Sequence, residues 1–228
     1  MKCEQPIQTL PFLNTCAPGT RLHFLELSRI VSFPKGRLCL RARESNDQIF
    51  FLLKGKAVVY NLTRCGRKKI LFVLGKGSLI NETLTGAVCS TYCETLEQSC
   101  FLAIRQRDLL SLMEQDFLLT CSLLSCQERK IWRLEHQLKN TISSIYLERK
   151  LSAKLWKLAR DFGIPTEKGI LIDMDLSITF LADFLGAPRE TTSRICRRLS
   201  ELGLIHMAKK KIYIPDPSRL SHFYRTGN

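Results

Sequence analysis

The sequence predicts an α+β protein in which a β-sheet region, one long helix and a helix-turn-helix follow one another along the chain. Short β-prone runs alternate with glycine or polar turns from Leu25 to Ile104, a spacing typical of an antiparallel sandwich or barrel. A helix-forming segment without glycine or proline extends from Asp108 to about Lys139. Two short amphipathic helices separated by Gly186 come later. We therefore expect three domains, over residues 1–107, 108–141 and 142–228.

Composition and charge limit the classes of function. The chain has 228 residues, 45% of them hydrophobic, which suits a globular protein and excludes a disordered or collagen-like chain. No apolar run approaches the roughly 18 to 20 residues that cross a bilayer, and the N-terminus lacks a secretory-signal pattern, so we expect a cytoplasmic protein. The net charge of +14 indicates a polyanionic partner. Residues 1–139 carry +8 (20 basic against 12 acidic) and residues 140–228 carry +6 (15 against 9), so charge alone does not locate that partner.

Glycine turns divide the β region. Gly55 and Gly66 each lie between two β-prone runs, as expected of hairpin turns in which φ is positive. The expected strands are Gln48–Leu53, Ala57–Leu62, Lys69–Leu74, Ser90–Leu96 and Ser99–Ile104.

The long helix carries an apolar stripe at heptad spacing, interrupted by Glu128 and Glu135. Because a long helix between two domains often buries such a stripe against a second copy of itself, we expect a homodimer. The alternative is a helix that lies on its own domain, and the stripe alone does not distinguish the two. The expected dimer interface consists of Phe117, Cys121, Leu124, Ile131 and Leu138.

Residues 177–203, SITFLADFLGAPRETTSRICRRLSELG, have the pattern of a helix-turn-helix. Ser177 is a natural N-cap, Gly186 supplies the turn, and Pro188 suits the first position of the second helix. An amphipathic helix over 146–162 and a short strand over 170–174 precede this pair. Two strand-like pieces around Lys209–Lys211 follow it and indicate the wing of a winged helix.

The second helix of this pair has the polar and basic face that DNA reading requires. Arginine donates two hydrogen bonds to guanine and glutamate accepts one from cytosine. Because the N-terminal half of such a helix enters the major groove, Arg189, Glu190 and Arg194 are expected to contact base edges. An ordinary solvated face is the alternative. The expected phosphate contacts are Thr191, Thr192, Ser193, Arg197, Arg198, Lys209 and Lys210.

The order of sandwich, long helix and LADFLGAPRETTSRICRRLSELGLI resembles the CRP/FNR (catabolite-activator and fumarate-nitrate-regulator) family of bacterial transcription regulators. The resemblance begins near residue 20 and implies a jelly-roll domain like those that bind cyclic nucleotides, a dimerisation helix and a winged helix-turn-helix. Arg189, Glu190 and Arg194 match the R-E-x-x-x-R motif of the family, which implies inverted-repeat operators with TGTGA-like half-sites. It also implies an effector-gated regulator, an activator that contacts RNA polymerase. A sensor that acts by protein contact alone is the alternative.

The effector site departs from the cyclic-nucleotide binders of the family. Those proteins have a glycine-glutamate pair for the ribose and an arginine for the phosphate. Here Glu82 is present, but Asn81 replaces the glycine, and Val88 or Cys89 stands where the arginine belongs. Because a buried phosphate without that cation is an uncompensated charge, cyclic AMP is not the expected effector. The run GKGSLINETLTG resembles the clostridial branch that senses halogenated aromatic acids, which implies a small organic acid. The expected pocket consists of Asn81, Glu82, Thr83, Leu84, Val88, Ser90, Leu123 and Gln127.

We expect no cofactor, metal centre or catalytic site. Only Cys3 and Cys16 precede residue 30, too few for an N-terminal iron–sulfur cluster. His23 resembles a surface residue more than a haem ligand, and the four histidines have no catalytic spacing. The ten cysteines fit a reducing compartment as inert thiols. A thiol-redox switch at Cys89, Cys93 and Cys100 is the alternative, with Cys89 and Cys93 on one face of a strand.

Replacing Glu190 by alanine should relax the preference for one base pair in each half-site, because only the carboxylate accepts the hydrogen bond from cytosine. The measurement is the affinity for operator duplexes that differ at single base pairs, where a wrong base costs the unsubstituted protein about 1–3 kcal/mol. Equal weakening on every sequence would contradict direct readout by Glu190.

Overall fold

The computed structural model describes residues 10–139 and 147–227. The chain divides into two compact units. The first contains residues up to 61 and 71–138, and the second contains residues 62–70 and the chain from 139 onward. The expected boundary between residues 141 and 142 falls outside the described residues. Within the described ranges, no helix is both long and apolar enough to cross a membrane.

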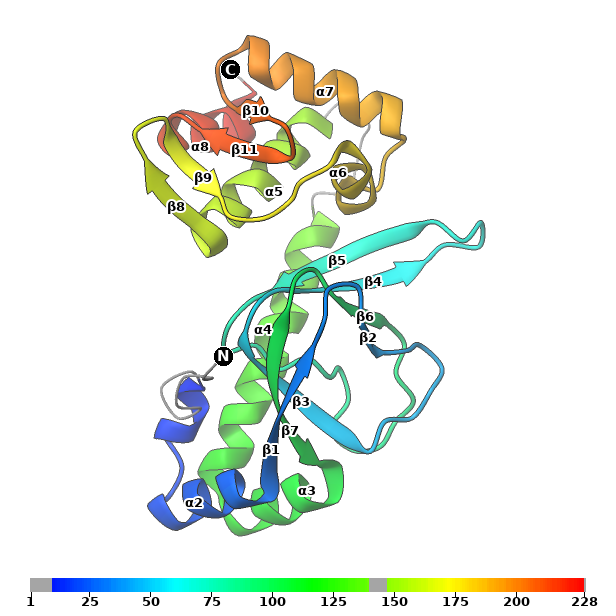
Figure 1. Cartoon of the computed structure of the whole chain (residues 1–228), viewed down its shortest axis with the longest axis vertical. Coiled ribbons are helices and arrows are strands. Elements are labelled where there is room, and N and C mark those ends of the chain that lie inside the picture. Colours follow the sequence, from blue (N-terminus) through cyan, green and yellow to red (C-terminus); the bar gives the residue numbers. More distant parts are fainter. Residues whose placement is uncertain (1–9, 140–146, 228) are drawn as a thin grey trace. The chain divides into compact units, whose positions relative to one another are not determined.

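Two β-sheets share a core in the first unit (Figure 1). The first sheet has the strand order β1-β7-β3 and is antiparallel. The second has the order β2-β6-β4-β5, and β6 runs antiparallel to both of its neighbours. This is the jelly-roll arrangement expected from the sequence. The strands are β1 (Ser28–Phe33), β2 (Leu38–Leu40), β3 (Gln48–Lys54), β4 (Ala57–Leu62), β5 (Lys68–Leu74), β6 (Tyr92–Thr95) and β7 (Ser99–Arg105).

The five strands expected between residues 48 and 104 are present, with ends shifted by at most two residues. β1 and β2 were not expected. Leu25 lies in a helix, α2 (Pro18–Leu27), rather than at the start of the β region. A short 3-10 helix, η1 (Pro11–Asn14), precedes it.

The central strands β3 and β7 are buried on both faces. Consecutive side chains of a strand point to opposite sides, and each side packs in a different hydrophobic cluster. In β3, Ile49 and Phe51 pack in the cluster that contains residues of the helices. Phe50 and Leu52 pack in the cluster between the two sheets. β7 alternates in the same way, with Leu102 on the helix side and Phe101 between the sheets. This double burial explains why both strands read as continuous apolar runs in the sequence.

The segment expected as one helix from Asp108 forms two helices, α3 (Gln106–Gln115) and α4 (Phe117–Lys139). Asp116 separates them. Its Oδ1 accepts hydrogen bonds from the backbone amides of Leu118 (3.0 Å) and Leu119 (3.1 Å), which is the geometry of an N-cap. Its Oδ2 accepts one from the amide of Ala17 (2.9 Å). The prediction of a single helix is therefore wrong, because an aspartate cap interrupts it without glycine or proline.

The second unit has the order helix, two strands, helix-turn-helix, two strands and helix. Its sheet has the strand order β10-β11-β9-β8. Strand β8 and helix α8 were not expected, although Asp216 marks the start of α8 by accepting the amides of Ser218 (2.8 Å) and Arg219 (3.1 Å). The elements are α5 (Leu147–Phe162), β8 (Gly163–Thr166), β9 (Gly169–Ile172), α6 (Ile178–Leu185), α7 (Arg189–Glu201), β10 (His206–Ala208), β11 (Lys211–Ile214) and α8 (Pro217–Thr226).

Gly55→Ala should destabilise the protein more than Gly66→Ala. Both glycines have positive φ, 95° and 71°, which costs an alanine about 1 kcal/mol. A Cβ on Gly55 would also lie 2.8 Å from Cα of Ser99, whereas a Cβ on Gly66 meets nothing within 4 Å. We expect a loss in the free energy of unfolding of about 1 kcal/mol for Gly66→Ala and more than about 2 kcal/mol for Gly55→Ala. Urea denaturation measures both, and equal losses would mean that the contact with Ser99 relaxes freely.

Candidate functional site

Helices α6 and α7 form the expected helix-turn-helix (Figure 1). The hydroxyl of Ser177 accepts a hydrogen bond from the amide of Phe180 (3.1 Å) and caps α6. Gly186 ends α6 with φ 76°, a left-handed conformation that favours glycine. Pro188 occupies the N-cap of α7, one residue earlier than expected. Its fixed φ of −58° still orients the chain for the helix that follows.

Helix α7 has one buried and one exposed face. Ile195, Cys196 and Leu199 are buried, while Glu190 and Arg194 are exposed. At 3.6 residues per turn, positions 190, 194 and 197 lie opposite the buried face. Arg189 is exposed at the N-terminal end of the same surface. The three side chains of the expected base-reading set therefore share the outer surface of α7.

The expected phosphate contacts on α7 are only partly available. Thr192 is fully buried, and its hydroxyl donates to the carbonyl of Pro188 (2.9 Å). The prediction for Thr192 is therefore wrong, because Thr192 lies on the inner side of α7 with Ile195 and Leu199. Thr191 and Ser193 are half-buried. Arg197 is exposed, and Arg198 lies 3.9 Å from the carboxylate of Glu148 on α5.

The wing is a tight hairpin. β10 and β11 pair antiparallel, with Ala208 opposite Lys211, so Lys209 and Lys210 form the turn. Both lysines are exposed. Lys209 has φ 56°, and the carbonyl of Lys210 accepts the amide of Leu176 (2.7 Å), which joins the wing to the segment before α6. The fixed turn holds two cations side by side.

Two protein-family descriptions match the chain in the order of this architecture. A cyclic nucleotide-binding domain matches residues 30–116, and a Crp-like helix-turn-helix domain matches residues 149–223. The chain belongs to the CRP/FNR family. It is a DNA-binding transcription regulator of that family.

Relatives of known name cover most of the chain. The global nitrogen regulator of Synechocystis sp. is 26% identical over 205 residues, 84% of this chain and 87% of that protein. FixK2 from Bradyrhizobium japonicum superposes with a TM-score of 0.75 at 16% identity, over 86% of this chain and 96% of that one. CprK complexed with OCPA superposes with a TM-score of 0.64 at 20% identity, over 98% and 100%. At these identities the solved structures show the fold alone.

In the CRP/FNR effector domain, the loop between β5 and β6 holds six of the eight expected effector residues, and Leu123 and Gln127 lie on α4. The carboxylate of Glu82 accepts hydrogen bonds from the amide and hydroxyl of Ser90 and from the hydroxyl of Thr91 (2.9 Å). The hydroxyl of Thr83 donates to the carbonyl of Ala87 (2.9 Å). These bonds fold the loop on itself and bring Glu82 and Ser90 together.

The other expected pocket residues have different surroundings. The amide of Asn81 is buried and bonds the backbone of β3, accepting from Phe50 (2.8 Å) and donating to the carbonyl of Gln48 (2.9 Å). Leu84 and Leu123 pack in the hydrophobic core, and Val88 is 58% exposed. The expected set is therefore only partly brought together, because apolar members of the loop point alternately into the core and into solvent.

Helix α4 binds this loop through main-chain carbonyls. Gln127 Nε2 donates to the carbonyl of Glu82 (3.1 Å), and Lys130 Nζ donates to that of Asn81 (2.7 Å). Burial lowers the pKa of Lys130 to about 8, although Cys126, Cys93, Glu82 and Cys89 act in the opposite direction. Lys130 was not expected, since one lysine in a charged helix segment carries no signal by itself. Its ammonium group contacts the backbone of the loop that lacks the family arginine.

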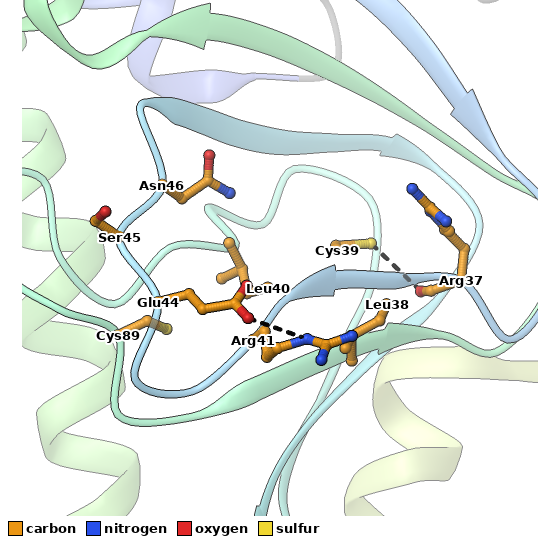
Figure 2. Close-up of a pocket in the computed structure, with 9 residues that line it drawn as sticks. All are labelled: Arg37, Leu38, Cys39, Leu40, Arg41, Glu44, Ser45, Asn46 and Cys89. Atoms are coloured by element: carbon orange, nitrogen blue, oxygen red, sulfur yellow. Dashed lines mark hydrogen bonds and ion pairs between the residues drawn. The ribbon is translucent and has the colours of Figure 1, made fainter.

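A cavity of about 230 Å³ lies beside the same loop. Figure 2 shows the residues around it, among them two cations, Arg37 and Arg41, and the carboxylate of Glu44. Arg41 pairs with Glu44 at 3.4 Å. Cys89 is the only loop residue of the 81–91 segment that lines it. The expected pocket residues and this cavity are therefore neighbours and not the same site.

Cys89 and Cys93 are shielded thiols, whereas Cys65 is an exposed thiol and Cys100 is disulfide-bonded. Burial raises the pKa of Cys89. A hydrogen bond with Cys39, and then burial, raise the pKa of Cys93 well above its usual value. A raised pKa lowers the fraction of reactive thiolate. Cys89 lies before β6 and not on it, so the expectation of one shared strand face is wrong. Among the described residues, no three His, Cys, Asp or Glu side chains are grouped as a metal site would require.

Helix α4 also has an outer apolar face. Leu119 and Leu123 are fully buried in the core of the first unit. On the other side, Phe117, Leu124 and Ile131 are exposed by 75%, 51% and 56%. Cys121 is half-buried, and the side chain of Leu138 lies outside the described residues. Leu118 and Trp132 extend the exposed apolar face beyond the expected stripe.

Proposed function

We propose that the protein is an effector-gated homodimeric regulator, an activator that contacts RNA polymerase and recognises an inverted repeat with TGTGA-like half-sites. The observation that carries this proposal is the shared outer surface of Arg189, Glu190 and Arg194 on α7, opposite a fully packed inner face. In this geometry the arginines donate to guanine O6 and N7, and Glu190 accepts from cytosine N4.

Phosphate contacts fix the position of α7 on the duplex. Arg197 lies on the exposed face of α7, and Lys209 and Lys210 occupy the wing turn. Thr191 and Ser193, on the sides of α7, contact the sugar-phosphate backbone of the DNA. Such contacts supply affinity without sequence preference. Sequence preference therefore depends on the three base-reading side chains.

The double substitution Arg189→Ala and Arg194→Ala should abolish the enrichment of one motif in a selection of bound sequences from random DNA. The unsubstituted protein should enrich an inverted repeat, because each arginine discriminates its base pair by about 1–3 kcal/mol. Arg160→Ala is the matched control, since Arg160 is an exposed arginine paired with Asp161 at 3.0 Å. A motif that survives the double substitution would remove base reading from these residues.

Helix α4 is proposed as the dimer interface. A long helix that buries Leu119 and Leu123 in its own unit still exposes Phe117, Leu124 and Ile131. The two alternatives for this helix are therefore compatible, because they use different faces of it. Pairing the exposed faces of two copies removes a contiguous apolar surface from water, which is the driving force of such dimers.

Ile131→Glu should convert the dimer to a monomer at micromolar concentration and weaken operator binding, because it places two charges in the apolar interface. Sedimentation equilibrium measures the mass. Ile164→Glu is the matched control, an exposed isoleucine of the second unit with 47% exposure against 56% for Ile131. If Ile131→Glu remains dimeric, α4 is not the interface.

The effector is proposed to be a small organic acid, such as a halogenated aromatic acid, bound between the loop of residues 81–90 and α4. Lys130 supplies the cation that the loop itself lacks, and Gln127 contacts the same loop. A ligand that binds both segments favours the dimer geometry in which they are close, which shifts the population toward the DNA-binding form.

Binding of aryl acids should weaken as the pH rises through about 8, the pKa of Lys130. A carboxylic acid stays ionised over this range, so loss of the lysine proton removes the attraction. Thermal shift with benzoic and phenylacetic acids and their chlorinated derivatives, at pH values from 6.5 to 9.5, measures this, with cyclic AMP and haem as comparison ligands. Lys130→Gln should remove the pH dependence and Lys54→Gln should not. Binding that is independent of pH contradicts the role of Lys130.

A further inference from the structure

The positive charge of the first part of the chain is concentrated in one segment. Residues 48–81 contain seven Lys and Arg and no Asp or Glu. Since residues 1–139 carry +8 in total, this segment accounts for +7 of that surplus. The charge is therefore not spread evenly along residues 1–139.

Four of the seven cations lie in the hairpin between β4 and β5. We call residues 62–69 the basic tip. All eight of its residues are exposed. The register of β4 with β6 ends at the pair Tyr60 and Tyr92, so the basic tip extends past that pairing, and Figure 1 shows the hairpin projecting. Its cations are Arg64, Arg67, Lys68 and Lys69.

The turn inside the basic tip is ordered by its own hydrogen bonds. The amide of Thr63 donates to the carbonyl of Arg67 (2.9 Å), and the amide of Gly66 donates to the carbonyl of Thr63 (2.9 Å). The hydroxyl of Thr63 accepts the amide of Arg67 (3.1 Å). Gly66 has φ 71°. A closed turn fixes the backbone that carries the cations, which lowers the entropy cost of binding. The guanidinium of Arg67 also donates to the main-chain carbonyl of Ala187, in the turn between α6 and α7 of the same unit (3.4 Å).

We propose that the basic tip binds the phosphate backbone of DNA, as a second contact beside the winged helix-turn-helix. Lysine and arginine side chains are the usual donors to phosphate oxygens, and two arginines allow bidentate contacts. The proposal uses the DNA binding that belongs to the family. It does not depend on the effector, the dimer or the sequence of the half-sites.

The composition of the basic tip favours DNA over an acidic protein surface. Protein interfaces depend on large apolar or aromatic residues at their centre. The basic tip has one large apolar side chain, Leu62, and no aromatic residue. Phosphate binding needs no such centre, since release of counterions provides the free energy.

The test is the salt dependence of binding to a duplex that extends about two helical turns beyond the operator on each side. In the variant Arg64→Gln, Arg67→Gln, Lys68→Gln and Lys69→Gln, the slope of log K against log salt should fall by at least about 2, because each lost phosphate contact lowers it by about 0.9. The same fall is expected on a long duplex of unrelated sequence, and the preference for the operator should not change.

The matched control removes the same charge elsewhere in the effector domain, with Arg29, Arg41, Arg105 and Arg107, all exposed, replaced by glutamine. Its slope should equal that of the unsubstituted protein. An unchanged slope for the tip variant overturns the proposal. If transcription falls in that variant while the slope stays unchanged, the proposal is equally overturned, and the basic tip is assigned to an acidic protein partner. An equal fall of the slope in both variants also overturns the proposal, because the net charge of the protein would then explain the salt dependence. Failure to bind any operator would instead contradict the proposed function.

Cys65 gives a second measurement that does not need a fourfold variant. This thiol is exposed within the basic tip, so a thiol-reactive photo-crosslinker attached there should form adducts with the bound duplex. Cys65→Ser, treated in the same way, should lose them. No loss of adducts in Cys65→Ser shows that the crosslinks arise from other cysteines and overturns the proposal.

Discussion

The arrangement of the effector domain depends on the hydrogen bonds of one buried carboxylate. Asp116 accepts the amide of Ala17 with one oxygen and the amides of Leu118 and Leu119 with the other. These bonds, with that of Ala17 first, hold the pKa of Asp116 below its usual value. Asp116 thus follows the last residue of α3, caps the start of α4 and holds the segment before α2 against this junction. A residue without a side-chain acceptor there would leave three amides to find other partners.

The restart at Asp116 fixes which side of α4 faces the β-sheets. With Leu119 and Leu123 in the core, Gln127 and Lys130 follow on nearly the same side and reach the loop of residues 81–82. The apolar residues at heptad spacing are then left outside. One helix therefore serves as core, as a contact of the effector loop and as an exposed apolar surface, without conflict between these roles.

Sequence patterns predicted what local chemistry determines. The strands between Gln48 and Ile104 were found because apolar runs end at turns, and the outer face of α7 followed from the period of its inner residues. Thr192 was misplaced because a threonine hydroxyl can be satisfied by the carbonyl of Pro188 and so be buried. Lys130 could not be predicted, since its partner is a main-chain carbonyl 49 residues away in the chain. The caps at Asp116 and Asp216 were not predicted. Asp116 lies in a run without glycine or proline, whereas Asp216 lies between Pro215 and Pro217, a helix-start signal that would have predicted α8.

The contacts from α4 to the effector loop end on main-chain oxygens, those of Asn81 and Glu82. A carbonyl is present whatever side chain a position carries. Substitutions in this loop that preserve its backbone course can therefore change its side-chain chemistry while the connection to α4 persists. The attachment of the loop to the helix is in this way independent of the side chains that the loop carries at Asn81 and Glu82.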